Sequence, residues 1–171
     1  MKIQRMISME FLGTAILAVA IVGSGHMAIN LQADSGMVLL INALATAIGL
    51  ALVIRIGMKV SGSHFNPAVT LVMLMLKKIT PQLSLFYITA QVVGAITGVG
   101  FANLLFDQKA LDQSSIERSG SNLFFSEIFA TAVLLWIILR FPKRDDLIAV
   151  YVPLWIFGAI LFTSSTSFAN P

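Results

Sequence analysis

Residues 61–70 read Ser-Gly-Ser-His-Phe-Asn-Pro-Ala-Val-Thr, a polar stretch that becomes apolar at Asn66-Pro67. Asn is a preferred N-cap, and Pro suits the first helical position because its missing N–H would have no partner there. The apolar run ends at Leu76, before Lys77 and Lys78. About ten helical residues rise about 15 Å, half the thickness of a bilayer's hydrocarbon core. The sequence therefore predicts a re-entrant half-helix over 67–76.

The sequence around this segment is that of a polytopic membrane protein. Of its 171 residues, 57% are hydrophobic and 11% are charged, whereas roughly 25% are charged in soluble domains. A helix crosses a bilayer with about 20 apolar residues. Five blocks reach that length, and they predict an all-α membrane protein with full helices at 6–29, 37–57, 82–106, 122–140 and 147–163. The first block is too long for the core of a signal peptide, so we expect a retained helix.

The basic residues indicate how the chain is oriented. If the N-terminus is inside, nine Lys and Arg fall on the inner side: Lys2, Arg5, Arg55, Lys59, Lys77, Lys78, Arg140, Lys143 and Arg144. Only Lys109 and Arg118 fall outside. This positive-inside bias predicts a cytoplasmic N-terminus in the cell (plasma or inner) membrane. The basic residues are thus orientation signals, and we expect no nucleic-acid partner.

Two sequence patterns occur twice in the same order. Glu10-Phe-Leu-Gly-Thr14 matches Glu127-Ile-Phe-Ala-Thr131, and Ser61–Pro67 matches Ser165-Thr-Ser-Phe-Ala-Asn-Pro171. Three predicted crossings separate the copies, so the second copy is upside down. Inverted repeats with broken helices that meet at the midplane are a recurring way to build a transport site.

The repeat suggests how the chain is divided. We expect a single pore domain over 1–171, with 1–106 as the first repeat and 122–171 as a partial second repeat.

The two Asn-Pro pairs predict an electrostatic barrier in a neutral pore. A helix N-terminus carries partial positive charge, and the Asn amide offers two hydrogen-bond donors. The oxygen of water or of a hydroxyl can accept a hydrogen bond from such a site, but a cation or a hydronium ion is repelled. Two such ends that face each other would pass water or small neutral solutes passively and exclude protons and ions.

The segment Ser61–Thr70 resembles the first signature of the aquaporin, or major intrinsic protein, family. Ser167-Phe-Ala-Asn-Pro171 resembles the start of the second signature, and the resemblance extends over all 171 residues. It implies a pore of six helices and two half-helices, usually a homotetramer in the full-length form, without a cofactor. The residues it places in the pore motifs are Asn66, Pro67, Ala68, Asn170 and Pro171.

This sequence departs from the family pattern at its end. The second half-helix, the arginine that normally follows the second motif, and a sixth helix are absent from the 171 residues. We therefore expect five full helices and one half-helix of an inverted-repeat bundle.

Three ionisable residues in apolar surroundings are candidates for holding the loops. Glu10 and Glu127 lie inside predicted helices, where carboxylates are costly and are usually paired or functional. We expect each to accept hydrogen bonds from a re-entrant loop, and the alternative is a proton relay. His64 is interpreted as a packing and hydrogen-bonding residue of the first loop, with a pH-sensitive gate as the alternative. His26 and His64 have no carboxylate or cysteine near them in sequence, so no metal site is expected.

The resemblance also gives candidates for the narrowest part of the pore. The family's constriction positions fall on Thr46, Gly158 and Ser167. Narrow water-only pores usually carry an aromatic ring and a histidine at the first two. The small residues here suggest a wider opening, suited to glycerol-like polyols or metalloid hydroxides as well as water.

Two other functions compete with the channel. One is a non-conducting fragment of such a channel gene, because an inverted repeat needs both halves to close. The other is an intramembrane enzyme, which is disfavoured because no Gly-x-Ser-x-Gly is present.

Overall fold

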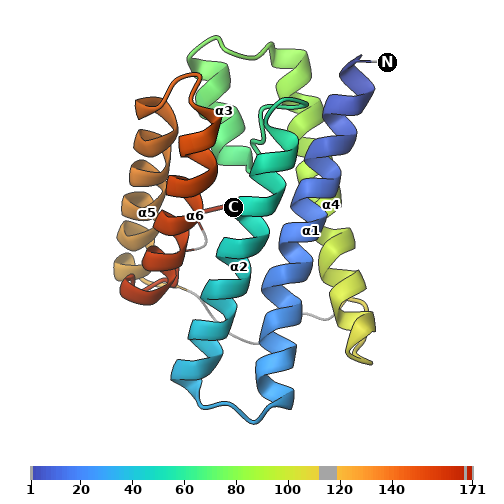
Figure 1. The fold of residues 1–171 in the computed structure, drawn as a ribbon, viewed down its shortest axis with the longest axis vertical. Coiled ribbons are helices and arrows are strands. Elements are labelled where there is room, and N and C mark those ends of the chain that lie inside the picture. Colours follow the sequence, from blue (N-terminus) through green and yellow to red (C-terminus); the bar gives the residue numbers. More distant parts are fainter. Residues whose placement is uncertain (1, 112–118, 168, 171) are drawn as a thin grey trace.

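The computed structural model describes residues 2–111, 119–167 and 169–170 (Figure 1). The described residues form six α-helices and no strand: α1 (Lys2–Asn30), α2 (Ser35–Gly57), α3 (Pro67–Met75), α4 (Pro81–Leu105), α5 (Ser121–Arg140) and α6 (Asp145–Phe162). All of them except α3 are long and apolar enough to cross a membrane. The predicted set of five full helices and one half-helix is confirmed.

The helix ends follow local capping. The side chain of Asp34 accepts from the backbone N–H of Met37 and begins α2, and Thr80 does the same for α4 with Pro81 in the first position. Helix α1 begins at Lys2 rather than at residue 6. Its first turn carries Lys and Arg, which favour helix and extend it beyond the apolar block.

Helices α1 and α4 pack backbone to backbone. A Cβ on Gly94 would lie 2.5 Å from the carbonyl oxygen of Phe11, and a Cβ on Gly98 would collide with the carbonyl oxygen of Ala15. Both glycines are therefore needed for this close approach, which is how small residues pack helices in membranes. The first half of the chain is built on this pair.

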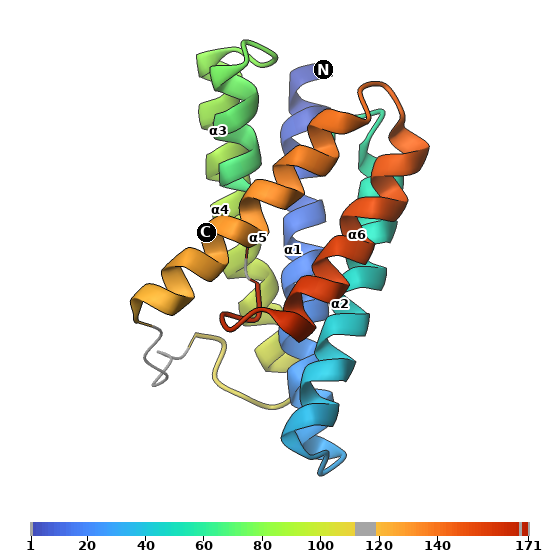
Figure 2. The same ribbon diagram turned by 90° about the vertical axis from the view of Figure 1, so that its left-hand side faces the viewer.

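The helices surround a central region where two loops meet. Helix α2 packs on both α1 and α6, and α3 packs on α4. Helix α5 packs on α6 and is strongly tilted (Figure 2). Asn66, just before α3, and Ala169, near the end of the chain, are both buried and bond to each other. The start of α3 is thus placed inside the bundle, as a re-entrant half-helix requires.

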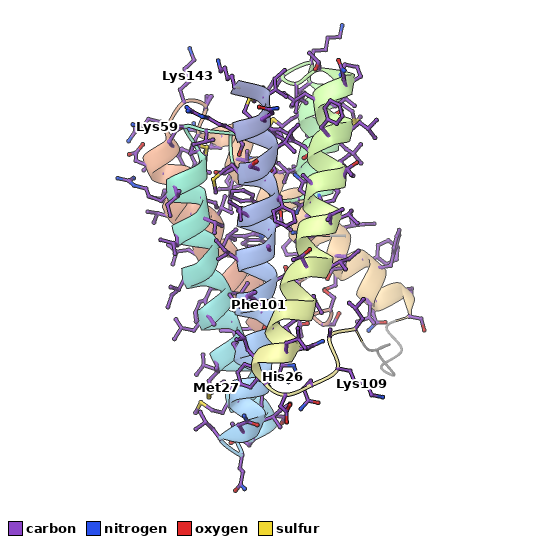
Figure 3. All side chains as sticks on the ribbon, turned by 90° about the vertical axis from the view of Figure 1, so that its right-hand side faces the viewer. His26, Met27, Lys59, Phe101, Lys109 and Lys143 are labelled. Carbon is purple, nitrogen blue, oxygen red and sulfur yellow. The ribbon has the colours of Figure 1, made fainter. Side chains whose placement is uncertain are left out.

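The charged residues separate along the long axis. Lys59 and Lys143 lie at one end of the molecule, and Lys109 lies at the opposite end, not far from His26 (Figure 3). Arg118 is outside the described residues. These three lysines are therefore divided between the two ends as the sequence pattern predicts.

Candidate pore

Asn66 caps the half-helix. Its side-chain oxygen accepts from the backbone N–H of Ala68 at 2.7 Å and of Val69 at 3.3 Å, and Pro67 follows as the first helical residue. Asn66 itself is extended, with φ of −156°, and is buried. The N-terminus of α3, with its partial positive charge, is thus held in the interior.

The first loop depends on left-handed backbone conformations. Gly62 has φ of +91°, and Ser63 and Phe65 have φ of 52° and 45°. The second loop shows the same signs at the matching positions, where Ser167 and Ala169 both have φ of 43°. Such values are unfavourable for residues other than glycine and persist only where surrounding contacts hold them.

Glu10 supplies those contacts in the first loop. Its Oε1 accepts from the Ser61 hydroxyl at 2.6 Å and from the backbone N–H of His64 at 3.1 Å. Its Oε2 accepts from the backbone N–H of Phe65 at 2.7 Å and from Gln91 Nε2 at 2.8 Å. The residue is completely buried. Four donors converge on one carboxylate, which is the arrangement expected of a residue that braces a loop.

The second glutamate repeats the key contact. Glu127 Oε2 accepts from the backbone N–H of Ala169 at 2.7 Å, and Ala169 precedes Asn170 as Phe65 precedes Asn66. The serines that start the two loops also correspond. The N–H of Ser63 donates to Ser61 Oγ, and the N–H of Ser167 donates to Ser165 Oγ.

The two loops are bonded to each other through their asparagines. Asn66 Nδ2 donates to the carbonyl oxygen of Ala169 at 2.6 Å, and Asn170 Nδ2 donates to the carbonyl oxygen of Phe65 at 3.0 Å. Each side-chain amide therefore donates one of its two hydrogens to the opposite loop, and its second hydrogen can bond to another partner. Pro171 lies outside the described residues.

A cavity of about 780 Å³ passes this meeting point. Its lining includes Ser35 and Asn42 toward one end and Lys78 and Lys143 toward the other. Both asparagines, His64 and Asp145 line it, and most of its other lining side chains are apolar and come from α1, α2, α3, α5 and α6. The arrangement offers a few polar groups to a solute inside an otherwise apolar passage, the usual character of a small-molecule site.

Thr46 and Ser167 lie on this cavity and are buried, at 4% and 3% exposure. Within the part of the chain that the structure describes, neither hydroxyl oxygen has a hydrogen-bond partner. The side-chain oxygen of Gln91 is in the same state, so these unpaired oxygens are not by themselves the sign of a solute site.

Gly158 is not brought to the cavity with them. A Cβ on Gly158 would lie 3.2 Å from the ring of Phe162, and α6 instead lines the cavity with Ile148, Val152, Ile156 and Ile160. These four recur every fourth residue and share one helix face, whereas Gly158 is two residues from the nearest and lies about 200° around the helix. Gly158 is thus not among the residues that line the cavity, and its place in the constriction stays a prediction.

Sequence reasoning missed three side chains that complete the first loop. Gln91 and Thr70 bond to each other at 3.0 Å, Thr70 contacts His64 Nδ1 at 3.1 Å, and Tyr87 donates to the carbonyl oxygen of Ser61 at 2.7 Å. All three are fully or almost fully buried. Their polar character inside apolar helices was the available signal, but it did not indicate their partners.

His26 is placed elsewhere, at the end of α1. Its Nε2 lies 2.9 Å from Asn103 Oδ1. No group of three potential metal ligands occurs among the residues that the structure describes.

Comparison with known proteins places this geometry in a family. The model of the major intrinsic protein family matches residues 1–168. Aquaglyceroporin AqpS of Rhizobium meliloti is 41% identical over 95% of this chain and 70% of its own length. Glycerol uptake facilitator protein-like 6 of Lactiplantibacillus plantarum is 34% identical over 80% of this chain, which spans 62% of that relative's length.

A solved structure agrees with these relatives. The X-ray structure of the aquaglyceroporin from Plasmodium falciparum superimposes with a TM-score of 0.72 at 25% identity, over 98% of this chain and 79% of that one. With the family match over nearly all of its residues and two loops that meet at Asn66 and Asn170, this chain belongs to the major intrinsic protein family.

Proposed function

We propose that the protein is a passive transmembrane channel for water and small neutral solutes of the glycerol kind, and that it excludes protons and ions. The observation that carries this proposal is the cavity that runs past Asn66 and Asn170 where the two loops bond to each other. Relatives named as an aquaglyceroporin and as a glycerol uptake facilitator support a polyol as well as water. Metalloid hydroxides share the same size and hydroxyl chemistry.

The exclusion of cations follows from the groups at the centre. The N-terminus of α3 points its free N–H groups and its dipole there, and each asparagine keeps one amide hydrogen for a solute. The one carboxylate among the described lining residues, Asp145, lies beside Lys143, and the side chains around the two asparagines are mainly apolar. An ion there would lose its hydration without replacement. A neutral hydroxyl can exchange its water for an amide donor.

The relatives' names also separate the channel from an enzyme, because they denote channels and facilitators. The inverted repeat, with 1–106 as its first part and 122–171 as its second, is supported by the matching loop contacts of Glu10 and Glu127. We include in the proposal the homotetramer that the family resemblance implies, which native mass measurement would check.

The width of the passage gives the functional test. Thr46→Phe places a ring where a small hydroxyl lines the cavity. A clash of about 1–3 kcal/mol in the narrowed passage would slow glycerol roughly tenfold or more, and water less. Glycerol and water flux are measured by light scattering in proteoliposomes that contain the variant or the unmodified protein, each expressed from the protein's own gene.

Leu44→Phe is the matched control, because Leu44 is on the same helix and 51% exposed. It should leave both fluxes unchanged. If the unmodified protein excludes glycerol, the proposed wide passage is wrong. Absence of any flux above that of empty vesicles would favour the non-conducting alternative.

The proposed orientation is a cytoplasmic N-terminus in the cell membrane. The chain has no cysteine, so a single introduced cysteine is a unique label. Lys109→Cys should react with an impermeant reagent added outside intact cells, and Lys59→Cys should react only after permeabilisation, because the two lysines lie at opposite ends (Figure 3). The reverse pattern would refute the orientation.

A further inference from the structure

We propose that His64 presents the lone pair of its Nε2 to the passage as a hydrogen-bond acceptor, and that Thr70 is the positioning residue that fixes the ring in this state. The passage would then offer an acceptor in the same cavity as the amide donors of Asn66 and Asn170. Its role in selecting solutes rests on the proposed channel function, but the state of the ring does not.

Glu10 sets the orientation of the Gln91 side-chain amide. One end of the Gln91 amide lies 2.8 Å from Glu10 Oε2 and 3.0 Å from Thr70 Oγ1. A carboxylate that already receives three other donors only accepts. That end of the amide must therefore be the nitrogen, and Gln91 donates to both Glu10 and Thr70.

Thr70 then has one hydrogen and one lone pair left for two neighbours. Its Oγ1 lies 3.0 Å from the carbonyl oxygen of Asn66 and 3.1 Å from His64 Nδ1. The carbonyl can only accept, so the hydroxyl hydrogen satisfies that contact. The remaining lone pair can only receive a hydrogen from His64, which places the ring proton on Nδ1.

The other tautomer leaves one contact unsatisfied. If Thr70 donated to His64, its oxygen would face the oxygen of Asn66 at 3.0 Å with no hydrogen between them. One hydrogen bond would be lost, which corresponds to roughly a twofold to tenfold preference for the first arrangement, before the repulsion of the two oxygens is counted.

Nε2 is consequently left as the free acceptor. Within the described residues no hydrogen bond reaches it, and His64 is one of the residues that line the cavity. Gly62 leaves the space beside it open, since even a Cβ there would lie 3.8 Å from Nε2. Tyr87 packs edge-on against the ring, with centroids 5.3 Å apart, and limits its rotation.

An acceptor in the same cavity as two donors distinguishes between neutral solutes. A hydroxyl can accept from an asparagine amide and donate to His64, whereas an acceptor-only solute can satisfy only the amides. Diols and triols should therefore pass more readily than sulfoxides or ethers of similar size.

The tautomer is tested by solid-state NMR of the protein in lipid, with histidine isotope-labelled on its ring nitrogens, at neutral pH. The chain contains two histidines, and His26→Gln assigns the signals. We expect His64 to show a protonated Nδ1 and an unprotonated Nε2. His26 should show the opposite, because its Nε2 faces the Oδ1 of Asn103. A His64 protonated at Nε2 in the unmodified protein would overturn the proposal.

The positioning role of Thr70 is tested in the same spectrum. Thr70→Ser keeps the hydroxyl and should preserve the His64 signals. Thr70→Val keeps the shape without the hydroxyl and should shift at least part of His64 to the form protonated at Nε2. Identical His64 signals in both variants would show that Thr70 does not fix the ring.

Solute selection is tested by flux. In proteoliposomes, the ratio of ethylene glycol to dimethyl sulfoxide permeability above that of empty vesicles should fall roughly twofold to tenfold in His64→Leu. His64→Gln carries an acceptor oxygen on a side chain of similar reach and should restore part of the ratio. An unchanged ratio in His64→Leu, in a protein that still conducts, would overturn the acceptor role. If the unmodified protein conducts no solute, the proposed channel function is wrong. The NMR spectrum of His64 would still decide the tautomer.

Discussion

Glu10→Gln should lower the free energy of unfolding by about 3 kcal/mol or more, since hydrogen bonds to a charged group contribute about 1.5–3 kcal/mol each. The substitution preserves size but replaces one carboxylate oxygen with an amide nitrogen. In one orientation the nitrogen faces Ser61 Oγ and the N–H of His64, and in the other it faces the N–H of Phe65 and the amide of Gln91. In either orientation at least one backbone donor loses its acceptor in the interior. The first loop should therefore be released from α1.

The measurement is unfolding of the protein in lipid or detergent, together with the yield of folded protein. Asp34→Asn is the matched control, because it also removes one negative charge but lies at an exposed cap where asparagine serves equally well. Protein that still folds should keep its solute selectivity. Normal yield with an altered proton leak would instead favour a proton relay through Glu10.

The sequence was sufficient for the helices and for the start of the half-helix. Apolar blocks of spanning length and the capping chemistry of Asn66-Pro67 are local properties, and the structure places α3 at Pro67–Met75. The repeated Glu and Ser-x-Ser-x-x-Asn-Pro patterns also indicated which residues would be near each other. The contact of Glu10 with the N–H of Phe65 is the kind of contact that such a pattern suggests.

The orientation of α6 could not be predicted in the same way. Membrane helices are apolar toward lipid as well as toward the interior, so their sequence carries little information about which face is buried. Gly158 was placed by spacing from the second Asn-Pro pair, whereas the cavity is lined by the stripe that contains Ile156 and Ile160. Only the packing of α6 on α2 distinguishes these faces.

The bonds between the two loops were also beyond the sequence. The sequence predicts that the amides of Asn66 and Asn170 donate to a passing solute, but it does not indicate that each gives one donor to a carbonyl more than a hundred positions away in the chain. The network of Gln91, Thr70 and His64 likewise joins α4, α3 and a loop. Such contacts depend on the three-dimensional arrangement and not on spacing.

Asn66→Asp should have the largest effect on ion exclusion. The carboxylate can still cap α3, because the N–H groups of Ala68 and Val69 require only an acceptor. It cannot donate to the carbonyl of Ala169, and its second oxygen would face that carbonyl at the present 2.6 Å. The second loop should be displaced, and a negative charge would oppose the helix dipole at the centre of the passage. A unit charge about 4 Å from a passing cation contributes about 4 kcal/mol at an effective dielectric constant of about 20, which is enough to raise proton or sodium leak by well over tenfold.

Ion leak is measured in proteoliposomes with a pH-sensitive dye inside, and with sodium in a parallel experiment. Asn42→Asp is the matched control, since Asn42 also lines the cavity but donates to the carbonyl of Ile21 and to Ser24, away from the meeting point of the two loops. A negative charge there is far from the N-terminus of α3 and should change ion leak little. Equal leak in the two variants would mean that charge anywhere in the passage admits cations. If Asn66→Asp conducts water but leaks no ions, the start of α3 is not part of the barrier to cations. A negative charge at the point where the two loops meet would then have no effect on ion exclusion.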